Sequence, residues 1–368
     1  MLIYILIAFF LLYTFTIIAF TIGWSKLKPI SNNGDSDNKY RFSIIIPFYN
    51  EEQNIKSLLE DLSKINYPKH SFEIIMINNE STDETGDIVR DYIFENDSEI
   101  KLHISDGSKK DAIWLGINNS IHDYILSIDG DCRVPANILN NYNIALNQKK
   151  SKIISGPVAF SSNNSLWGKF MEFEFMSLVA SGAGAIGIKK PIMLNAANML
   201  FEKEMALKAR HIYKSDEVSG DDIFLMMYAI KNYGNSSIQF LKNQSSIIST
   251  NAPSSFKSWV NQRLRWAAKA KHYTINATSI TAIIILGFNI LASVMFPLGI
   301  INPDYAILSI SAFLLKTIVD LPLLYSSSAF FNKKHLVKYI LLFELIYPYY
   351  VVIISFYSIF YKENWKNE

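Results

Sequence analysis

The first 25 residues form an apolar segment long enough to constrain both the fold and the location of the chain. They contain no Asp, Glu, Lys or Arg. At a rise of about 1.5 Å per residue, a helix of this length crosses the roughly 30 Å hydrocarbon core of a bilayer. A cleaved signal peptide is the alternative, but no basic segment precedes the apolar run and no small-x-small cleavage site follows it. We therefore expect a retained N-terminal membrane helix.

Three further apolar segments lie near the C-terminus. Residues 273–303 are uncharged, residues 305–331 carry only Lys316 and Asp320, and residues 339–361 carry only Glu344. Each segment predicts a membrane span. Lys316 and Asp320 have helical i, i+4 spacing, so they can pair on one helix face, either to join neighbouring helices or to line a pathway.

The basic residues that flank these segments predict an orientation. They fall in three places: Lys26 and Lys28, Arg263–Lys271, and Lys333, Lys334 and Lys338. The turn at Asn302–Asp304 has no Lys or Arg. Because cytoplasmic loops carry the excess of basic residues, residues 25–272 are expected to face the cytoplasm of an inner or plasma membrane.

The net charge and the cysteine content say little about the class of protein. A net charge of +2 gives no argument for a nucleic-acid partner. Cys132 is the single cysteine, so an internal disulfide is impossible, which agrees with a reducing compartment.

The middle of the chain alternates predicted strands and helices. After the polar linker NNGDSDNK, buried strands are predicted for RFSIIIPF, FEIIMIN, KLHIS and YILSID, with single helices between them. Asn50 and Gln53 are expected to form a capping box at the first helix. Strands separated in this way make right-handed crossovers, so we predict an α/β fold with a mostly parallel sheet.

Polar side chains follow all four predicted strands. They lie at Tyr49–Glu51, Asn78–Asp83, Asp106–Lys110 and Asp129–Asp131. Ligands of such sheets bind beyond the carboxyl ends of the strands. Neither G-x-G-x-x-G after the first strand nor a P-loop motif is present, and a hydrolase of the Asp-x-Asp-x-Thr type needs its aspartates after the first strand. Taken alone, Asp129 and Asp131 could also be an ordinary solvated turn.

An ordered set of motifs resembles the membrane-bound family 2 glycosyltransferases, which have the GT-A fold and include ceramide glucosyltransferase, hyaluronan synthase and cellulose synthase. The motifs are SIIIPFYNEEQNI, FEIIMINNESTDET, IDGDCRV, SGPV, NAANMLF, SGDDIFLM and QRLRW, within about residues 41–271. With the apolar segments they imply a transmembrane helix at 1–25, a linker at 26–40, a cytosolic GT-A domain at 41–272, three transmembrane helices at 273–361 and a tail at 362–368.

The resemblance implies inverting transfer of a sugar from a nucleotide diphosphate donor, assisted by Mg²⁺ or Mn²⁺. It assigns Asp131 to the metal, and Asp129 to the nucleoside or to the metal through water. Asp221 and Asp222 in SGDDIFLM match the family's acidic motif, which makes Asp222 the general base that takes the proton of the acceptor hydroxyl, with Asp221 beside it. Two acids at a helix start could instead only complement the helix dipole.

QRLRW supplies the third part of the expected site. If residues 255–271 are helical, Gln262, Arg265 and Trp266 share a face. The resemblance assigns Arg265 to the diphosphate, and Gln262 and Trp266 to the acceptor. The alternative is a basic, Trp-bearing helix that only anchors the chain at the membrane surface.

The remaining donor-site candidates are weaker matches. The family's loop after the first strand packs on the nucleotide, which points to Pro47, Tyr49 and Glu51. Lys109 matches a lysine near the diphosphate, although Ser108 replaces the usual Gly and a solvated lysine is equally compatible. The family's Asp-Asp at the end of the second strand is here Asn78 and Asn79. An amide still offers an acceptor to a base N–H, so a UDP-sugar remains the favoured donor.

The acceptor is expected to be a lipid or a lipid-linked glycan. Ser165–Lys190 is interpreted as a membrane-surface helix followed by a flexible loop near the acceptor, with a plain core helix as the alternative. A processive polysaccharide synthase is the second hypothesis, and it needs a translocation channel that four spans alone enclose poorly. A non-catalytic membrane scaffold that keeps the fold is a third. A homo-oligomer is compatible with each.

Overall fold

The computed structural model describes residues 2–30, 39–210, 221–269 and 277–361. The chain divides into two compact units. The membrane unit contains Met1–Lys26, Ser162–Ile192 and Ala252–Glu363, and the sheet unit contains Leu27–Ser161 and Met193–Asn251. Both units are therefore assembled from segments that are far apart in the sequence.

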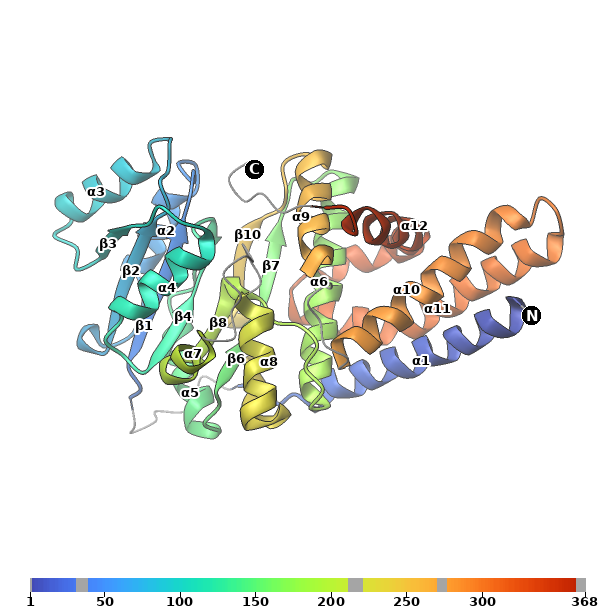
Figure 1. Ribbon diagram of the computed structural model, residues 1–368, viewed down its shortest axis with the longest axis horizontal. Coiled ribbons are helices and arrows are strands. Elements are labelled where there is room, and N and C mark those ends of the chain that lie inside the picture. The colour runs from blue at the N-terminus through green and yellow to red at the C-terminus, as the bar shows by residue number, and fades with distance from the viewer. Residues whose placement is uncertain (1, 31–38, 211–220, 270–276, 362–368) are drawn as a thin grey trace. The chain divides into compact units, whose positions relative to one another are not determined.

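A seven-stranded sheet forms the centre of the sheet unit, in the order β3-β2-β1-β4-β8-β6-β9 (Figure 1). β1 pairs in parallel with β2 and β4, whereas β8 is antiparallel to β4 and β6. The predicted α/β fold with a mostly parallel sheet is confirmed. The strands are β1 (Phe42–Phe48), β2 (Phe72–Asn78), β3 (Lys101–Ile104), β4 (Tyr124–Ser127), β6 (Ile153–Ser155), β8 (Met199–Glu202) and β9 (Ile238–Phe240).

A second, three-stranded sheet has the order β5-β10-β7. β10 (Ile248–Asn251) pairs antiparallel with β5 (Cys132–Arg133) and parallel with β7 (Val158–Ser161). This pairing matters for the site, because β5 begins directly after Asp131.

Helix α2 of the sheet unit buries one apolar stripe. In α2, Ile55, Leu58, Leu59 and Leu62 are buried at the spacing of one helix face. The described helices are α2 (Ile55–Ser63), α3 (Thr85–Glu95), α4 (Lys109–Asn119), α5 (Ile138–Gln148), α7 (Lys203–Ala209) and α8 (Asp221–Tyr233).

The expected capping box at Asn50 and Gln53 is wrong. The N-cap of α2 is Asn54, without a side-chain cap. Asn50 instead has a φ of 53°, in the left-handed region that Asn tolerates. Its side-chain oxygen accepts the backbone N–H of Thr82 at 2.8 Å, so it ties the loop after β1 to the loop after β2.

The membrane unit contains α1 (Leu2–Lys26), α6 (Leu166–Gly187), α9 (Phe256–Ala268), α10 (Ala277–Leu298), α11 (Pro303–Phe330) and α12 (Ile340–Ser358). Among the described residues, 4 helical segments are long and apolar enough to cross a membrane, namely those of α1, α10, α11 and α12.

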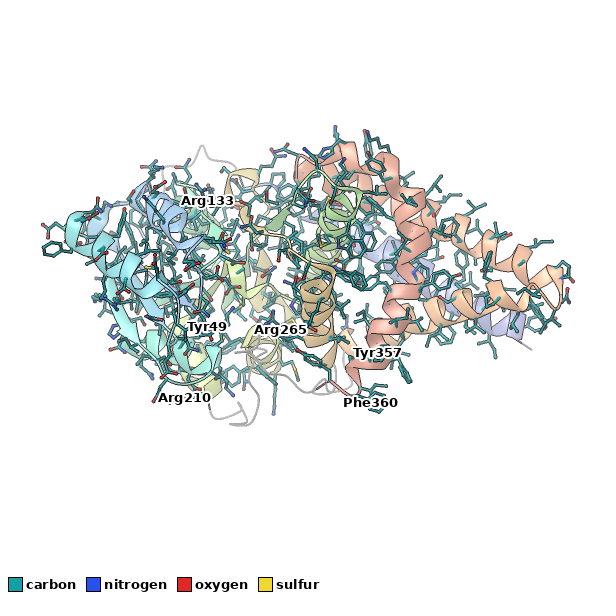
Figure 2. All side chains as sticks on the ribbon, turned by 90° about the horizontal axis from the view of Figure 1, so that it is seen from above. Tyr49, Arg133, Arg210, Arg265, Tyr357 and Phe360 are labelled. Carbon is teal, nitrogen blue, oxygen red and sulfur yellow. The ribbon has the colours of Figure 1, made fainter. Side chains whose placement is uncertain are left out.

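These helices do not all run in one direction. Figure 1 shows α1, α10 and α11 side by side, with α12 crosswise to them. In Figure 2, Tyr357 and Phe360 mark the end of α12, away from the turn that joins α10 to α11. A helix of spanning length can therefore also lie across the other three.

α6 packs against α1 through glycines. A Cβ on Gly184 would collide with the backbone carbonyl of Phe20, and one on Gly23 with the carbonyl of Gly184. The flexible loop expected in this segment is wrong, because SGAGAIG is helical to its last residue. Small residues are needed here for close approach of two backbones, rather than for mobility.

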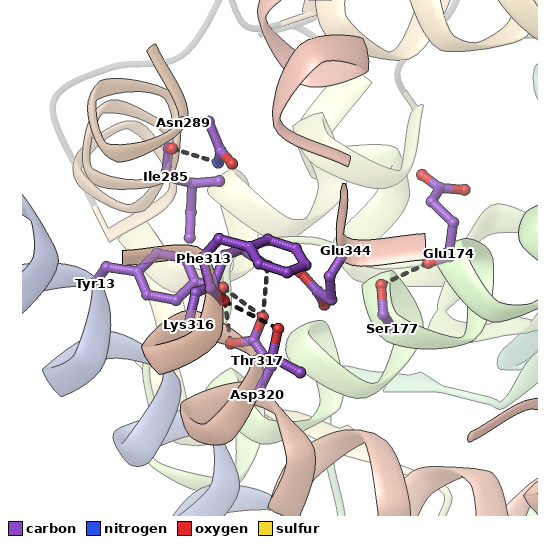
Figure 3. A network of polar contacts seen from close by, with 10 residues as sticks. All are labelled: Tyr13, Glu174, Ser177, Ile285, Asn289, Phe313, Lys316, Thr317, Asp320 and Glu344. Atoms are coloured by element: carbon purple, nitrogen blue, oxygen red, sulfur yellow. Dashed lines mark hydrogen bonds and ion pairs between the residues drawn. The ribbon is translucent and has the colours of Figure 1, made fainter. Parts of the chain in front are cut away.

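A polar cluster joins three helices of the membrane unit (Figure 3). Lys316 lies 2.7 Å from Asp320, which confirms the predicted i, i+4 pair. Lys316 also pairs with Glu344 of α12, and the Tyr13 hydroxyl of α1 donates to both oxygens of Asp320 at 2.7 Å. Phe288 of α10 stacks on Tyr13 with 4.8 Å between ring centres. The pair is therefore part of a larger contact between helices.

Candidate active site

Asp131 is held by the smaller sheet of its unit. β4 ends at Ser127 and β5 starts at Cys132, so Asp129 and Asp131 occupy the turn between the two sheets. Oδ2 of Asp131 accepts the hydroxyl of Thr250 at 2.5 Å, and Thr250 stands opposite Cys132 in the β10–β5 pairing. The position of this carboxylate is thus fixed by strand register.

Gly130 separates the two aspartates because there is no room for a side chain. A Cβ there would lie 2.8 Å from Cβ of Phe48 and 3.4 Å from Cγ of Glu51. The turn therefore packs directly on the carboxyl end of β1, which brings Glu51 against the aspartate pair.

Lys109 lies beside the aspartate pair. Its Nζ is 2.6 Å from Oδ1 of Asp129. Lys109 is the first residue of α4, whose N-cap is Ser108; Ser108 and Asp111 form a capping box. Serine in place of the family's usual glycine is explained by this cap.

The electrostatics of the cluster favour an added cation. Desolvation, together with the neighbouring Asp129, raises the pKa of Asp131. Desolvation raises the pKa of Glu51 to about 7; the hydrogen bond from Asn54 opposes this shift, and Asp131 and Asp129 add to it. Three carboxylates share this region with one lysine, so a positive ligand stabilises their ionised forms.

A divalent cation fits this donor set. The described residues contain no cluster of three or more His, Cys, Asp or Glu side chains arranged as a complete metal site. Asp129 and Asp131 offer hard oxygen ligands, and Mg²⁺ characteristically binds one or two carboxylates and takes its other ligands from substrate phosphates and water. The pair can hold a metal together with a diphosphate.

The two asparagines at the end of β2 have different environments. Oδ1 of Asn78 accepts the backbone N–H of Ser81 at 2.8 Å, so this side chain shapes the loop. Asn79 is fully buried and donates from Nδ2 to the carbonyl of Gly107 at 3.1 Å. Its Oδ1 has no hydrogen-bond partner among the described residues. Of the two asparagines, Asn79 therefore has a side-chain oxygen that accepts no hydrogen bond from the described residues.

The other donor-site candidates follow β1. Pro47 is a buried residue of the strand, and it lies beyond the last residue of β1 that pairs with β4, so its missing N–H breaks no bond there. Tyr49, labelled in Figure 2, is half-buried in the following loop. The backbone N–H of Glu51 donates to the Thr85 hydroxyl at 2.7 Å, which fixes this loop to the start of α3.

Asp221 and Asp222 are the first two residues of α8 as it is described. Oδ1 of Asp222 accepts the backbone N–H of Ile223 at 2.9 Å, and its side chain is half-buried. Both residues are helical, the segment before them lies outside the described residues, and the role of Asp222 stays a prediction.

The QRLRW residues belong to the membrane unit. Gln262, Arg265 and Trp266 lie on α9, as predicted, and all three are half-buried (Arg265 is labelled in Figure 2). Arg263 is the buried member of the motif, and its Nη1 donates to Oε1 of Gln262. Arg263 is not among the residues that the family resemblance assigns to the site.

Two contacts were missed because their signals are not local. Thr250 lies far along the chain from Asp131, and only the pairing of β10 with β5 brings it there. Arg263 looks like one more basic residue before a span. Its apolar neighbours on α9 were the available hint that this arginine is buried.

Together the parallel sheet, the acidic turn after β4 and the lysine of α4 define a nucleotide-diphospho-sugar transferase of the GT-A type. One solved structure, the mannosyltransferase PcManGT from Pyrobaculum calidifontis in complex with GDP-Man and Mn2+, is similar over 100% of both chains, with a TM-score of 0.64 and 16% sequence identity. At this identity the similarity concerns the fold alone.

Sequence comparison gives the family. The model described as Glycosyl transferase family 2 matches residues 43–197, and the one described as Glycosyl transferase family group 2 matches residues 124–361, which is more than half of the chain. The chain belongs to the family 2 glycosyltransferases.

Two curated relatives share about a quarter of the aligned residues with this chain. A Methanococcus voltae protein, the dolichyl N-acetyl-alpha-D-glucosaminyl phosphate 3-beta-D-2,3-diacetamido-2,3-dideoxy-beta-D-glucuronosyltransferase, is 25% identical over 238 residues, covering 61% of this chain and 71% of the relative. A poly-beta-1,6-N-acetyl-D-glucosamine synthase of Staphylococcus epidermidis is 26% identical over 192 residues, covering 49% of this chain and 43% of the relative. The chain thus matches less than half of the length of the second relative.

Proposed function

We propose that this chain transfers a sugar, with inversion, from a nucleotide diphosphate donor to a lipid or lipid-linked acceptor at the membrane. The observation that carries the proposal is the group formed by Glu51, Asp129, Asp131 and Lys109 at the ends of β1 and β4 and the start of α4. It combines excess negative charge, which a divalent cation relieves, with a lysine suited to a phosphate oxygen.

In the proposed site, Asp131 and Asp129 hold Mg²⁺ or Mn²⁺. The bound cation stabilises the charge of the leaving diphosphate. Lys109 and Arg265 are proposed contacts of the diphosphate, and Pro47, Tyr49 and Glu51 of the nucleoside. Asn79 is the proposed contact of the base, because it stands where the family has a base-contacting aspartate and an amide oxygen can accept an N–H. A UDP-sugar is the favoured donor on the same ground.

Asp222 is the proposed general base. It takes the proton of the acceptor hydroxyl as that oxygen attacks the anomeric carbon, while the bond from that carbon to the diphosphate breaks. Its match to the second acidic residue of the family's motif supports this role. Asp221 is proposed to assist beside it, and Gln262 and Trp266 to form the acceptor site.

The archaeal relative supports a lipid-linked acceptor, because its name gives a dolichyl-linked sugar phosphate. The staphylococcal relative keeps a second candidate, processive polysaccharide synthesis. The four apolar helices found among the described residues are few for a polymer channel. We therefore favour transfer of a single sugar, by a catalytic GT-A domain at residues 41–272 that faces the cytoplasm.

The test uses the full-length protein in detergent or vesicles with a panel of UDP- and GDP-sugars, with and without Mn²⁺. Release of the nucleotide diphosphate is measured alone and with dolichyl N-acetylglucosaminyl phosphate or N-acetylglucosamine oligomers as acceptors. Metal-dependent turnover with one donor supports the enzyme. Absence of turnover with every donor, together with no binding of any nucleotide diphosphate, supports the scaffold hypothesis instead.

A further inference from the structure

Arg263 is a buried cation inside a motif whose other polar members are half-buried. It is 3% exposed, whereas Gln262, Arg265 and Trp266 on the same helix are half-buried. A buried guanidinium is costly unless it is paired and hydrogen-bonded. Its partners therefore show what keeps it there.

The partner of Arg263 is Glu174 of α6. Nε of the arginine lies 3.2 Å from Oε1 of the glutamate, and Nη2 pairs with Oε2. This two-point pairing fixes the plane of the guanidinium, as a lysine could not. Glu174 is also buried, and Figure 3 shows it on α6 in the membrane unit.

A third helix completes the network. The hydroxyl of Tyr350 on α12 donates to Oε1 of Glu174 at 2.6 Å. The ring of Tyr350 packs on Trp259 of α9, with 5.1 Å between ring centres. One residue of α12 thus contacts both the carboxylate that orients Arg263 and the helix that carries it.

The guanidinium in turn contacts both predicted acceptor residues. Nη1 donates to Oε1 of Gln262. The guanidinium carbon lies 4.3 Å from the centre of the Trp266 ring, within the range of a cation–π contact. Phe175 of α6 packs on the same indole, with 5.8 Å between ring centres. A change in the orientation of Arg263 therefore displaces the amide and the indole together.

We propose that Arg263 is a positioning residue for the acceptor, and that Glu174 and Tyr350 are the groups through which α6 and α12 set its orientation. Arg263 keeps the Gln262 amide and the Trp266 indole in the arrangement that a sugar ring contacts. This inference rests on the proposed function. It adds that the membrane unit determines acceptor affinity through one buried ion pair, while donor chemistry is independent of that pair.

The test compares acceptor-dependent with acceptor-independent turnover. Tyr350→Phe removes one hydroxyl and keeps the ring against Trp259, and Arg263→Lys keeps the charge and loses the fork. Each is expected to raise the KM for dolichyl N-acetylglucosaminyl phosphate in vesicles by about tenfold, the scale of one hydrogen bond to a charged group. Donor hydrolysis without acceptor and affinity for the nucleotide diphosphate stay at the wild-type value. Lys257→Gln, an exposed change on the same helix, is the matched control.

The double variant separates positioning from simple stabilisation. If the two groups act through one network, Tyr350→Phe combined with Arg263→Lys raises the KM by less than the product of the single effects. An unchanged acceptor KM in both single variants overturns the inference, and so does an equal loss of donor hydrolysis and transfer.

A spectroscopic readout does not depend on the acceptor chosen. The near-UV circular dichroism band that is present in the wild type and lost in Trp266→Phe comes from the Trp266 indole. This band therefore reports the environment of that side chain. Arg263→Lys is expected to alter that band and Lys257→Gln to leave it intact; no change in Arg263→Lys overturns the inference. If the wild-type protein hydrolyses a donor but does not transfer to the dolichyl acceptor, the proposed acceptor class fails, and the band still decides the role of Arg263.

Discussion

Removing Lys316 is expected to destabilise the membrane unit more than removing one of its acidic partners. Among the described residues, Lys316 is the one cation paired with both Asp320 and Glu344, and the three side chains are only 2%, 9% and 7% exposed. Lys316→Met leaves two buried carboxylates facing each other without the ammonium group. Breaking a buried pair in this way costs about 3–5 kcal/mol. Glu344→Gln leaves the pair of Lys316 and Asp320, which has one charge of each sign.

The order of three variants tests this charge count. Lys316→Met should have the lowest free energy of unfolding, and Lys316→Met combined with Glu344→Gln should recover part of the loss, because the second carboxylate is then neutral. Glu344→Gln alone should lie close to the wild type. Thermal unfolding in detergent, followed by tryptophan fluorescence, gives the ranking. If the double variant is less stable than Lys316→Met, the charge argument is refuted.

Four further results are expected. Asp222→Asn should abolish transfer and leave the affinity for the nucleotide diphosphate within about twofold of the wild type. Asp131→Ala should weaken Mn²⁺-dependent binding of the nucleotide diphosphate by about tenfold or more, because it removes a charged metal ligand. A transfer assay measures the first effect, and calorimetry measures the second. In metal-free buffer, the free energy of unfolding should fall as the pH rises from about 4.5 to about 7. The reason is that Glu51 keeps its proton over this range in the folded protein, whereas the unfolded chain releases it. Glu51→Gln should flatten this dependence of the unfolding free energy on pH. Gly184→Val should reduce the yield of folded protein, because its side chain collides with the α1 backbone.

Each of these has a contradicting outcome. Full transfer by Asp222→Asn would remove the base assignment, and unaltered metal dependence in Asp131→Ala would remove the metal assignment. A pH profile that Glu51→Gln leaves unchanged would place the titrating group elsewhere. Wild-type yield of Gly184→Val would show that α1 and α6 tolerate separation.

The sheet and the acidic turn could be predicted because their signals are local. Runs rich in Ile mark β1 and β2, and Asp129 and Asp131 closely follow a strand. The alternation of strands and helices therefore places them at one sheet edge. The apolar helices near both ends could be predicted equally well, because a membrane-spanning helix is recognised by its length and its lack of charged residues.

Other features depend on partners far away in the sequence. Asn50 has the residue type of an N-cap, yet its side chain bonds to the loop after β2, which no local pattern indicates. SGAGAIG has the composition of a flexible loop, and it is helical because α1 lies against it. The direction of α12 also could not be inferred, since a helix that crosses its neighbours has the same composition as one that runs along them.

The glycine contact between α1 and α6 has a consequence for biosynthesis. Gly23 leaves the ribosome about 160 residues before Gly184, and at about 5–20 residues per second the interval is on the order of ten seconds or longer. During that time α1 must remain in the bilayer without the helix that later covers its glycine. An apolar helix of this length can insert into a bilayer alone. On this order of synthesis, α6 docks onto α1 only after the strands of the sheet unit that precede α6 have been made.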